Sequence, residues 1–190
     1  MGDGTTPSPL YNVWRKRIMV ICGIDASTNK TGISIFKDGK YIEHTLIDLH
    51  KDKKIQTRLP KMMCEICSYL DKAQPDKIIM EKSVLKSNVA TVQLLSMLSG
   101  AVLCYAAQHD IKFENPTPSA WRARVGLQQS NKVERTALKL EALQAVKQEY
   151  GLDVTDDEAE SILLGRSGFE LPKLNITTED VDWDLVDTLN

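Results

Sequence analysis

An Asp-Gly pair at Asp38-Gly39 separates two runs of largely alternating apolar residues, and it constrains the fold more than any other feature of the sequence. Asp and Gly both tolerate the positive φ angles of a two-residue hairpin turn. Residues 31–36 and 41–49 are therefore predicted to form two antiparallel strands. A further apolar, β-branched run at 17–24 comes before them, and a short polar turn separates it from the run at 31–36. We therefore expect the fold to open with three antiparallel strands.

The rest of the chain alternates helical and strand patterns. Apolar residues at helical spacing predict five helices, over residues 57–73, 88–108, 118–125, 132–150 and 156–164. Gly151 and Gly165 are expected to end the last two of them. Short apolar runs predict two more strands, over 77–80 and 111–114. This order predicts an α/β fold with a mixed five-stranded sheet, in which three antiparallel strands are followed by two parallel ones and helices flank the sheet.

The 190 residues, 42% of them hydrophobic and 26% charged, suit a single globular domain. We predict a flexible leader over 1–16, one domain over 17–168 and an acidic tail over 169–190. A formal net charge of -2 gives no general attraction to nucleic acid, so a phosphate-binding surface would have to come from local clusters of Lys and Arg, such as the one over 122–135.

The longest apolar stretches, around 18–24 and 94–107, are interpreted as too short or too interrupted to cross a membrane. No signal peptide pattern opens the chain, so we expect a soluble, intracellular protein, cytoplasmic and without a membrane partner. Cys64 and Cys67 form a CxxC pair, but no second pair or nearby His completes a zinc set. All four cysteines are therefore expected to be reduced and to lie in or near the core.

Acidic residues stand at three places where a cleft is expected. Asp25 and Glu81 each end an apolar strand, where burial discourages a charge that has no partner. Asp157 and Glu160 lie three residues apart and share one face of a predicted helix. Converging carboxylates repel one another unless divalent cations lie between them, and Mg²⁺ binds a few carboxylates together with waters and phosphate oxygens. Two such ions would support phosphodiester hydrolysis.

The same acids also fit ordinary structural roles. Asp25 could form a turn, and acids at 156–158 are favoured by the dipole at the start of a helix. From spacing alone, the metal site and the structural interpretation carry equal weight.

Four strings, in order, resemble the RuvC-like Holliday-junction resolvases. GIDASTNKTGISIF at 23–36 is similar to the first strand-turn-strand of that family, whose pattern there is GIDPGxxxTG. EKSVLKSNVATVQLLSMLSGAVL at 81–103 is similar to its strand-end Glu, apolar loop and apolar helix, and NPTPSAWRARVGL at 115–127 to its proline-marked entry into a basic segment. DDEAESILLG at 156–165 is similar to its final D-x-x-D-A motif.

This resemblance implies a ribonuclease H-like fold and a nuclease, dependent on Mg²⁺ with Mn²⁺ as a substitute, that cuts four-way DNA junctions in recombination or repair. It places the metal-binding and catalytic carboxylates on Asp25, Glu81, Asp157 and Glu160. It offers Lys132 and Lys139 as candidates for a catalytic lysine. The DNA contacts that it implies are Lys82, Val84, Leu85, Lys86, Arg122, Arg124, Lys132 and Arg135, with Val84 and Leu85 as an apolar wedge at the junction crossover.

A homodimer is the expected assembly, because a four-way junction offers two symmetry-related strands to a two-fold enzyme. The predicted helix that begins near Val89 is apolar over more of its circumference than packing on one sheet requires, which also favours a partner.

The chain departs from the family pattern at several positions. Ala26-Ser27 replaces Pro-Gly, and Glu160-Ser161 replaces the final Asp-Ala, although Glu is still a hard oxygen ligand. Asp156 leaves the register of the last motif open. The alternatives are another ribonuclease H-like nuclease, such as an RNase H or a flap nuclease, and a non-catalytic DNA-binding relative. The first string also resembles the phosphate loop of actin-like ATPases, but no second Gly-rich phosphate loop follows.

Overall fold

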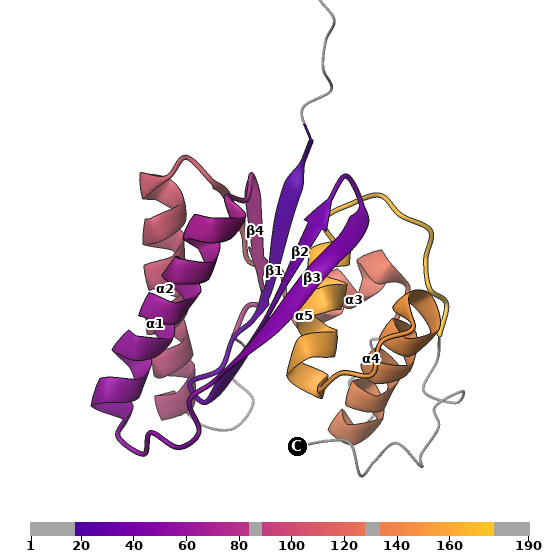
Figure 1. Cartoon of the computed structure of the whole chain (residues 1–190). Coiled ribbons are helices and arrows are strands. Elements are labelled where there is room, and N and C mark those ends of the chain that lie inside the picture. The colour runs from indigo at the N-terminus through magenta and orange to yellow at the C-terminus, as the bar shows by residue number, and fades with distance from the viewer. Residues whose placement is uncertain (1–17, 84–88, 128–133, 177–190) are drawn as a thin grey trace, which may run out of the picture.

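The computed structural model describes residues 18–83, 89–127 and 134–176. Its centre is a five-stranded sheet in the order β3-β2-β1-β4-β5 (Figure 1). β1 pairs antiparallel with β2 and β2 with β3, whereas β1 with β4 and β4 with β5 are parallel pairs. The predicted mixed sheet is therefore confirmed, with strands β1 Val20–Asp25, β2 Lys30–Lys37, β3 Lys40–Asp48, β4 Lys77–Met80 and β5 Lys112–Glu114.

The predicted hairpin joins β2 to β3. Asp38 and Gly39 have φ angles of 49° and 79°, as the turn requires, and Lys37 pairs with Lys40 on either side of them. The Asp38 carboxylate also accepts a hydrogen bond from the backbone N–H of Met19, at 2.9 Å. The hairpin is thereby tied to the residue that precedes β1.

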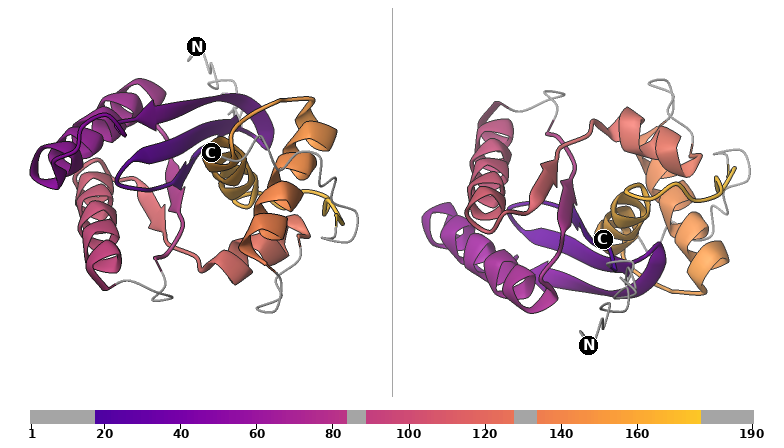
Figure 2. Two further views of the ribbon diagram at one scale, coloured as in Figure 1. Left: turned by 90° about the horizontal axis from the view of Figure 1, so that it is seen from below. Right: turned by 90° about the horizontal axis from the view of Figure 1, so that it is seen from above.

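Helices cover both faces of the sheet, as Figures 1 and 2 show. One layer consists of α1 (Ile55–Ala73) and α2 (Val89–Gln108), and the other of α3 (Pro118–Val125), α4 (Arg135–Tyr150) and α5 (Asp156–Arg166). Because successive side chains of a strand point to opposite faces, Ile21 joins the core under α3–α5, whereas Cys22 and Ile24 join the core under α1 and α2.

The last described helix, α5, corrects one prediction. It was expected to end before Gly165, but it continues to Arg166. Gly165 is required for the packing of α5 on β2 and does not end the helix, because a Cβ at this position would lie 2.7 Å from both the Ser34 Oγ and the Phe36 ring. The glycine lets the helix backbone approach the sheet closely.

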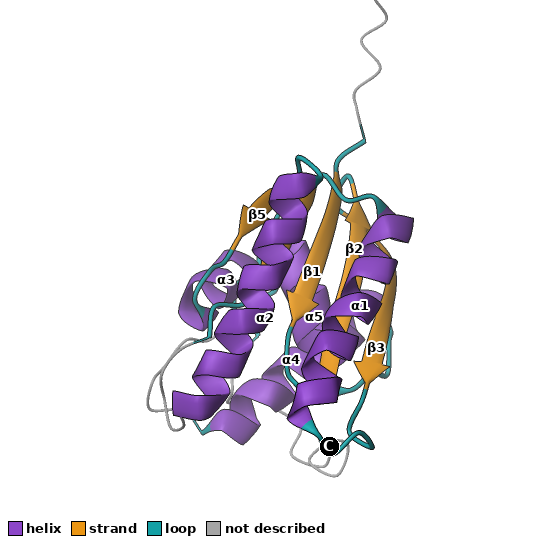
Figure 3. Cartoon of the chain, turned by 90° about the vertical axis from the view of Figure 1, so that its left-hand side faces the viewer, coloured by secondary structure: helices purple, strands orange, loops and turns teal. Residues whose placement is uncertain are grey.

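The apolar helix α2 lies beside α1 over the sheet (Figure 3). It contributes Leu98 and Val102 to the core, yet Val89, Met97 and Leu103 are exposed. By length and composition it could cross a membrane, so the expectation that every apolar stretch is too short or too interrupted was wrong. The same length and composition also occur in core helices of soluble proteins, so one such helix is weak evidence for a membrane.

The cysteines are less buried than expected. Cys22 is buried in β1 and Cys67 is half-buried on α1, but Cys64 and Cys104 are exposed on α1 and α2. The placement of these last two in or near the core was wrong, because each lies on the outer side of its helix. All four cysteines are free thiols.

The segment that follows α5 packs back onto the domain. The backbone N–H of Leu174 donates to the carbonyl of Val125 at 2.8 Å, and Ile176 is buried in the core under α3–α5. The Arg166 guanidinium also donates to the carbonyl of Pro172 at 2.8 Å. The described part of the predicted tail, residues 169–176, therefore lies against α3 and α5; the predicted leader over 1–16 lies outside the described residues.

Candidate active site

Two predicted site residues stand side by side because their strands are parallel neighbours. Ile24 of β1 pairs with Met80 of β4, so the next residue of each strand, Asp25 and Glu81, lies at the same edge of the sheet. The backbone N–H of Glu81 donates to the carbonyl of Ile24 at 3.3 Å, which continues the strand pairing to the acid itself. The topology therefore brings these two carboxyl groups together across 56 residues of sequence.

Helix α5 brings the other two acids to this edge. It lies directly on β1 and β2 because these strands have glycines where it crosses them. A Cβ on Gly23 would lie 2.3 Å from the Ser161 carbonyl oxygen, and a Cβ on Gly32 would lie 2.1 Å from the Asp157 carbonyl oxygen. The Ser34 hydroxyl also donates to the Ser161 carbonyl at 2.7 Å. The backbone around Asp157 and Glu160 therefore approaches the sheet closely.

The start of α5 is fixed by a capping box. The Thr155 side chain accepts from the backbone N–H of Glu158, and the Glu158 carboxylate accepts from the backbone N–H of Thr155 at 2.9 Å. Glu158 therefore has the capping role that was considered for all three acids at 156–158. Asp157 and Glu160 are not part of this capping box.

The pKa values show that the predicted carboxyl groups act on one another. Burial raises the pKa of Asp25 well above its usual value, and the charges of Glu160, Glu81, Asp157 and Asp156 raise it further. Burial and the charge of Asp156 raise the pKa of Asp157 to about 6. Burial and the charge of Glu81 raise the pKa of Glu160 to about 7. Such mutual repulsion is what a divalent cation would relieve.

Sequence reasoning missed one contact of this site. The Trp121 indole nitrogen, on α3, donates to Glu81 Oε2 at 2.5 Å. The apolar spacing of Trp121 and Val125 could have shown that this residue is buried. No local pattern connects it with a carboxylate 40 residues earlier in the chain.

The predicted cationic residues occupy different environments. Lys139 forms an ion pair with Asp156, and its charge lowers the pKa values of Asp157 and Glu160, so it lies close to the acids. Arg122 is buried and forms an ion pair with Glu141, a poor arrangement for a phosphate contact. Arg124 forms an ion pair with Glu114. Lys82 and Arg135 are exposed, and the remaining predicted residues, Val84, Leu85, Lys86 and Lys132, lie outside the described residues.

Among the described residues, no group of three or more His, Cys, Asp or Glu side chains is arranged to hold one metal ion. The donor set nevertheless suits Mg²⁺, which commonly takes one or two protein carboxylates and completes its octahedron with waters and substrate phosphate oxygens. Asp25 and Glu81 at the sheet edge, with Asp157 and Glu160 opposite, supply hard oxygen ligands of that kind. One oxygen of the neighbouring Asp156, Oδ1, is buried without a hydrogen-bond partner.

The family model described as crossover junction endodeoxyribonuclease RuvC matches residues 21–162. The chain belongs to the RuvC family. A curated RuvC of Hydrogenovibrio crunogenus is 28% identical over 109 residues, which cover 55% of this chain. The match spans 63% of that relative's own length, a little under two thirds.

Solved structures support the fold of this RuvC-family chain. A Thermus thermophilus RuvC, in complex with a Holliday junction substrate, superposes with a TM-score of 0.62 at 14% identity, covering 78% of this chain and 92% of that one. A fowlpox virus resolvase with its substrate Holliday junction DNA gives a TM-score of 0.55 at 18% identity, covering 79% and 96%. At these identities the likeness shows the fold alone.

Proposed function

We propose that the chain is a divalent-metal-dependent endonuclease, using Mg²⁺ or Mn²⁺, that hydrolyses phosphodiester bonds in four-way DNA junctions during recombination or repair. The observation that carries this proposal is the convergence of Asp25 and Glu81, at the ends of parallel neighbours β1 and β4, with the acids of α5. Membership of the RuvC family, the crossover junction endodeoxyribonucleases, supports it. As a DNA-acting enzyme, the protein would be soluble and intracellular.

In this proposal the four carboxylates would hold two Mg²⁺ ions, which would supply activation of the attacking water and stabilisation of the leaving oxygen. Asp25 and Glu81 would hold the ions from the sheet edge, and Asp157 and Glu160 from α5. Because burial and mutual repulsion raise the pKa values of Asp157 and Glu160 to about 6 and about 7, these groups would lose protons as the ions bind.

The cations near the site would hold the phosphates. The Lys139 ammonium, paired with Asp156, is close enough to lower the pKa values of the neighbouring acids and could stabilise charge that develops at the scissile phosphate. Lys82 is exposed directly after Glu81, and Arg135 is exposed at the start of α4. We therefore propose Lys82, Arg124, Arg135 and Lys139, with Lys86 and Lys132, as DNA contacts, and leave the buried Arg122 out.

Selectivity for branched DNA is proposed to come from Val84 and Leu85, which follow Lys82 in the sequence. An apolar wedge can replace stacking lost at a crossover, whereas a linear duplex would first have to be unstacked at a cost of a few kcal/mol per step. A Val84→Ser, Leu85→Ser double variant should therefore keep its fold and metal site but lose more junction cleavage than residual activity on relaxed or flexible substrates.

A homodimer is proposed through the exposed side of α2. Val89, Met97 and Leu103 are 60%, 63% and 50% exposed on this helix, a pattern more typical of an interface than of a solvated surface. A two-fold dimer would present one site to each of two symmetry-related strands of a junction.

Incubation of the purified chain with labelled four-way junction, linear duplex and RNA–DNA hybrid, each with Mg²⁺ or EDTA, tests the proposal. We expect junction cleavage only with the metal, and none by Asp25→Asn or Glu81→Gln, which should still bind the junction because affinity comes mainly from phosphate contacts. Preferred cleavage of the hybrid would indicate an RNase H. Binding without cleavage under every condition would indicate a non-catalytic relative.

A further inference from the structure

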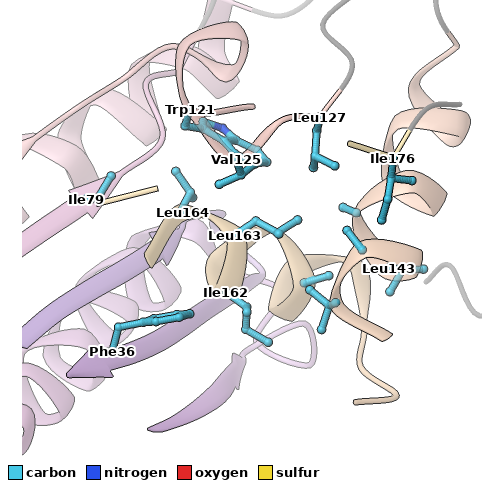
Figure 4. Close-up of a cluster of buried hydrophobic side chains, with 14 of the residues drawn as sticks. Phe36, Ile79, Trp121, Val125, Leu127, Leu143, Ile162, Leu163, Leu164 and Ile176 are labelled. Atoms are coloured by element: carbon cyan, nitrogen blue, oxygen red, sulfur yellow. The ribbon is translucent and has the colours of Figure 1, made fainter. Parts of the chain in front are cut away.

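The contact between Trp121 and Glu81 joins the candidate site to the core under α3–α5. Trp121 is fully buried in that core, together with Val125 and Leu164 (Figure 4). Its indole nitrogen nevertheless donates to a carboxylate oxygen of Glu81 at 2.5 Å. The ring thus has one polar atom at the site, while the remainder packs in the apolar core, with the Arg122 guanidinium 5.3 Å from the ring centroid.

The position of this indole is fixed by the helix that carries it. Thr117 caps the start of α3 by accepting from the backbone N–H of Ala120, and Gly126 ends the helix with a φ angle of 86°. The next residue, Arg122, is buried and ties α3 to α4 through its ion pair with Glu141 and a 3.3 Å hydrogen bond to the Leu138 carbonyl. The helix therefore has little freedom to move relative to the core.

The backbone on either side of Glu81 is fixed to the same connection. The N–H of Lys82 donates to the Pro116 carbonyl at 2.8 Å. The Asn115 side-chain amide donates to the Met80 carbonyl at 2.7 Å. Asn115 and Pro116 lead from β5 into α3, so the carboxyl group, its flanking backbone and the indole belong to one hydrogen-bonded unit.

The chemistry of the indole suits a carboxylate that must be held in one orientation. Its N–H only donates and does not titrate near neutral pH, so it pairs with an acceptor oxygen of the Glu81 carboxyl group. A carboxylate has about four lone-pair directions, so one indole hydrogen bond leaves capacity for a metal ion. Hydrogen-bond partners that orient a metal ligand commonly affect metal affinity strongly.

We propose that Trp121 is a positioning residue that orients the Glu81 carboxylate toward the metal ions. This inference rests on the proposed nuclease site, and it adds to that site a residue from the apolar core. Trp121 does not touch substrate or metal in this proposal; it acts through Glu81.

The contact can be tested first in the metal-free, full-length chain by NMR of the indole N–H groups. The sequence has three Trp, and the signal lost in Trp121→Phe identifies that of Trp121. Replacing Glu81 by Gln substitutes a neutral acceptor for a charged one, so the Trp121 signal should move to higher field. The control Asp157→Asn should leave it in place. An indole signal that Glu81→Gln does not move would overturn the inference.

Mn²⁺ binding to the full chain, measured by calorimetry, tests the functional part. Trp121→Phe keeps an aromatic ring but removes the donor, and we expect affinity to fall about 10- to 100-fold. The matched control is Val125→Ala, which opens a cavity in the same core without touching Glu81, and which should lose stability but keep the wild-type affinity. Equal affinity in Trp121→Phe and wild type would contradict the positioning role.

The two measurements separate this inference from the proposed function. A wild-type chain that binds no Mn²⁺ would overturn the metal site, and with it the role of Trp121 toward the metal. A wild-type chain that binds Mn²⁺ and cuts junctions, with unchanged affinity in Trp121→Phe, would overturn the inference alone. If Trp121→Phe fails to fold, Trp14→Phe and Trp183→Phe identify the other two indole signals, and the behaviour of the third in Glu81→Gln still decides whether the contact exists.

Discussion

The carbonyl oxygen of Asp157 lies against Gly32, so closely that a Cβ on this glycine would be 2.1 Å from it. No real Cβ makes such a contact with backbone, so any side chain at Gly32 has to push the start of α5 away from β2. The separation between Asp25 and the acids of α5 therefore depends on a missing side chain in the neighbouring strand.

Gly32→Ala should consequently damage both stability and metal binding. We expect a loss of about 1–3 kcal/mol in the free energy of unfolding, as for overpacked cores. The fraction of molecules that folds should bind Mn²⁺ more weakly. Urea denaturation and calorimetry measure the two effects. Gly100→Ala is the control, because nothing lies within 4 Å of its Cβ and a helix gains about 0.5–1 kcal/mol from Ala over Gly. A Gly32→Ala chain as stable as wild type would show that α5 does not rest on β2.

The raised pKa values predict an unusual pH dependence of the metal-free protein. Asp157 and Glu160 titrate at about 6 and about 7 in the folded chain, above their usual values of 3.8 and 4.5. A raised folded pKa stabilises the fold below the unfolded value, and this stability is lost as pH rises through the folded value. Between pH 5 and pH 8 the unfolding temperature should therefore fall.

Thermal unfolding with EDTA and with Mg²⁺ checks this prediction. Mg²⁺ should restore stability at pH 8, because it binds the ionised carboxylates and only the folded chain brings them together. Asp48 and Glu114 have lowered pKa values, so their stabilising effect is already complete above pH 5 and does not mask the trend. Asp25→Asn removes one of the repelling groups and should flatten the pH profile. A stability that rises from pH 5 to pH 8 without metal would contradict the proposed clustering.

The sequence predicted the strands and helices well because each element has a strong local pattern. The Asp38-Gly39 turn, the apolar alternation of the first strands and the glycine after Tyr150 all act over a few residues. The strand-end position of Asp25 and Glu81 was also readable, since parallel neighbours align their ends. The prediction that a helix ends at Gly165 was wrong, because this glycine is required for close packing on Phe36 and Ser34.

The details of the site depend on contacts between distant residues, which no local pattern encodes. Arg122 was assigned to DNA because it lies in a basic segment, but its partner Glu141 is 19 residues away on α4. The indole of Trp121 meets Glu81 only after β4 and α3 are placed. Exposure of Cys64 and Cys104 likewise depends on which side of each helix faces the sheet.

Arg122 should behave as a core residue rather than as a DNA contact. Arg122→Met leaves Glu141 buried without its guanidinium partner, which typically costs about 3–5 kcal/mol. Adding Glu141→Leu should recover much of that loss. The control Arg124→Met removes a 41% exposed side chain and should cost less than about 1 kcal/mol. Chemical denaturation decides; a stable Arg122→Met with weaker, less salt-dependent junction binding would return Arg122 to the DNA surface.

The register of the last motif can be decided by two amide substitutions. Asp157→Asn should abolish cleavage, whereas Asp156→Asn should reduce it less, because the Asp156 carboxylate is engaged by Lys139. Single-turnover cleavage of a four-way junction with Mg²⁺ gives the ranking. Greater damage from Asp156→Asn would move the metal ligand by one residue, which its buried, unpartnered Oδ1 would then explain.

The exposed side of α2 gives a sharp test of the proposed dimer. Met97 and Leu103 are at least half exposed in the monomer, and an interface would bury them. The double variant Met97→Glu, Leu103→Glu would place carboxylates in apolar surroundings at that interface. If this costs about 3 kcal/mol, the dimer dissociation constant rises about 100-fold.

Analytical ultracentrifugation across nanomolar to micromolar concentrations measures this shift. The matched control is Ile42→Glu, since Ile42 is a similarly exposed apolar residue, at 46%, but lies on β3. We expect Ile42→Glu to leave the association unchanged. Met97→Glu, Leu103→Glu should yield folded monomers. These monomers should bind Mn²⁺ like wild type, because α2 does not carry the carboxylates. Such monomers should nick one strand of a junction without the paired second cut that a two-fold enzyme makes. If the wild-type chain is monomeric at all concentrations, with and without junction DNA, the proposed dimer is wrong. A dimer interface would then not explain the apolar surface of α2.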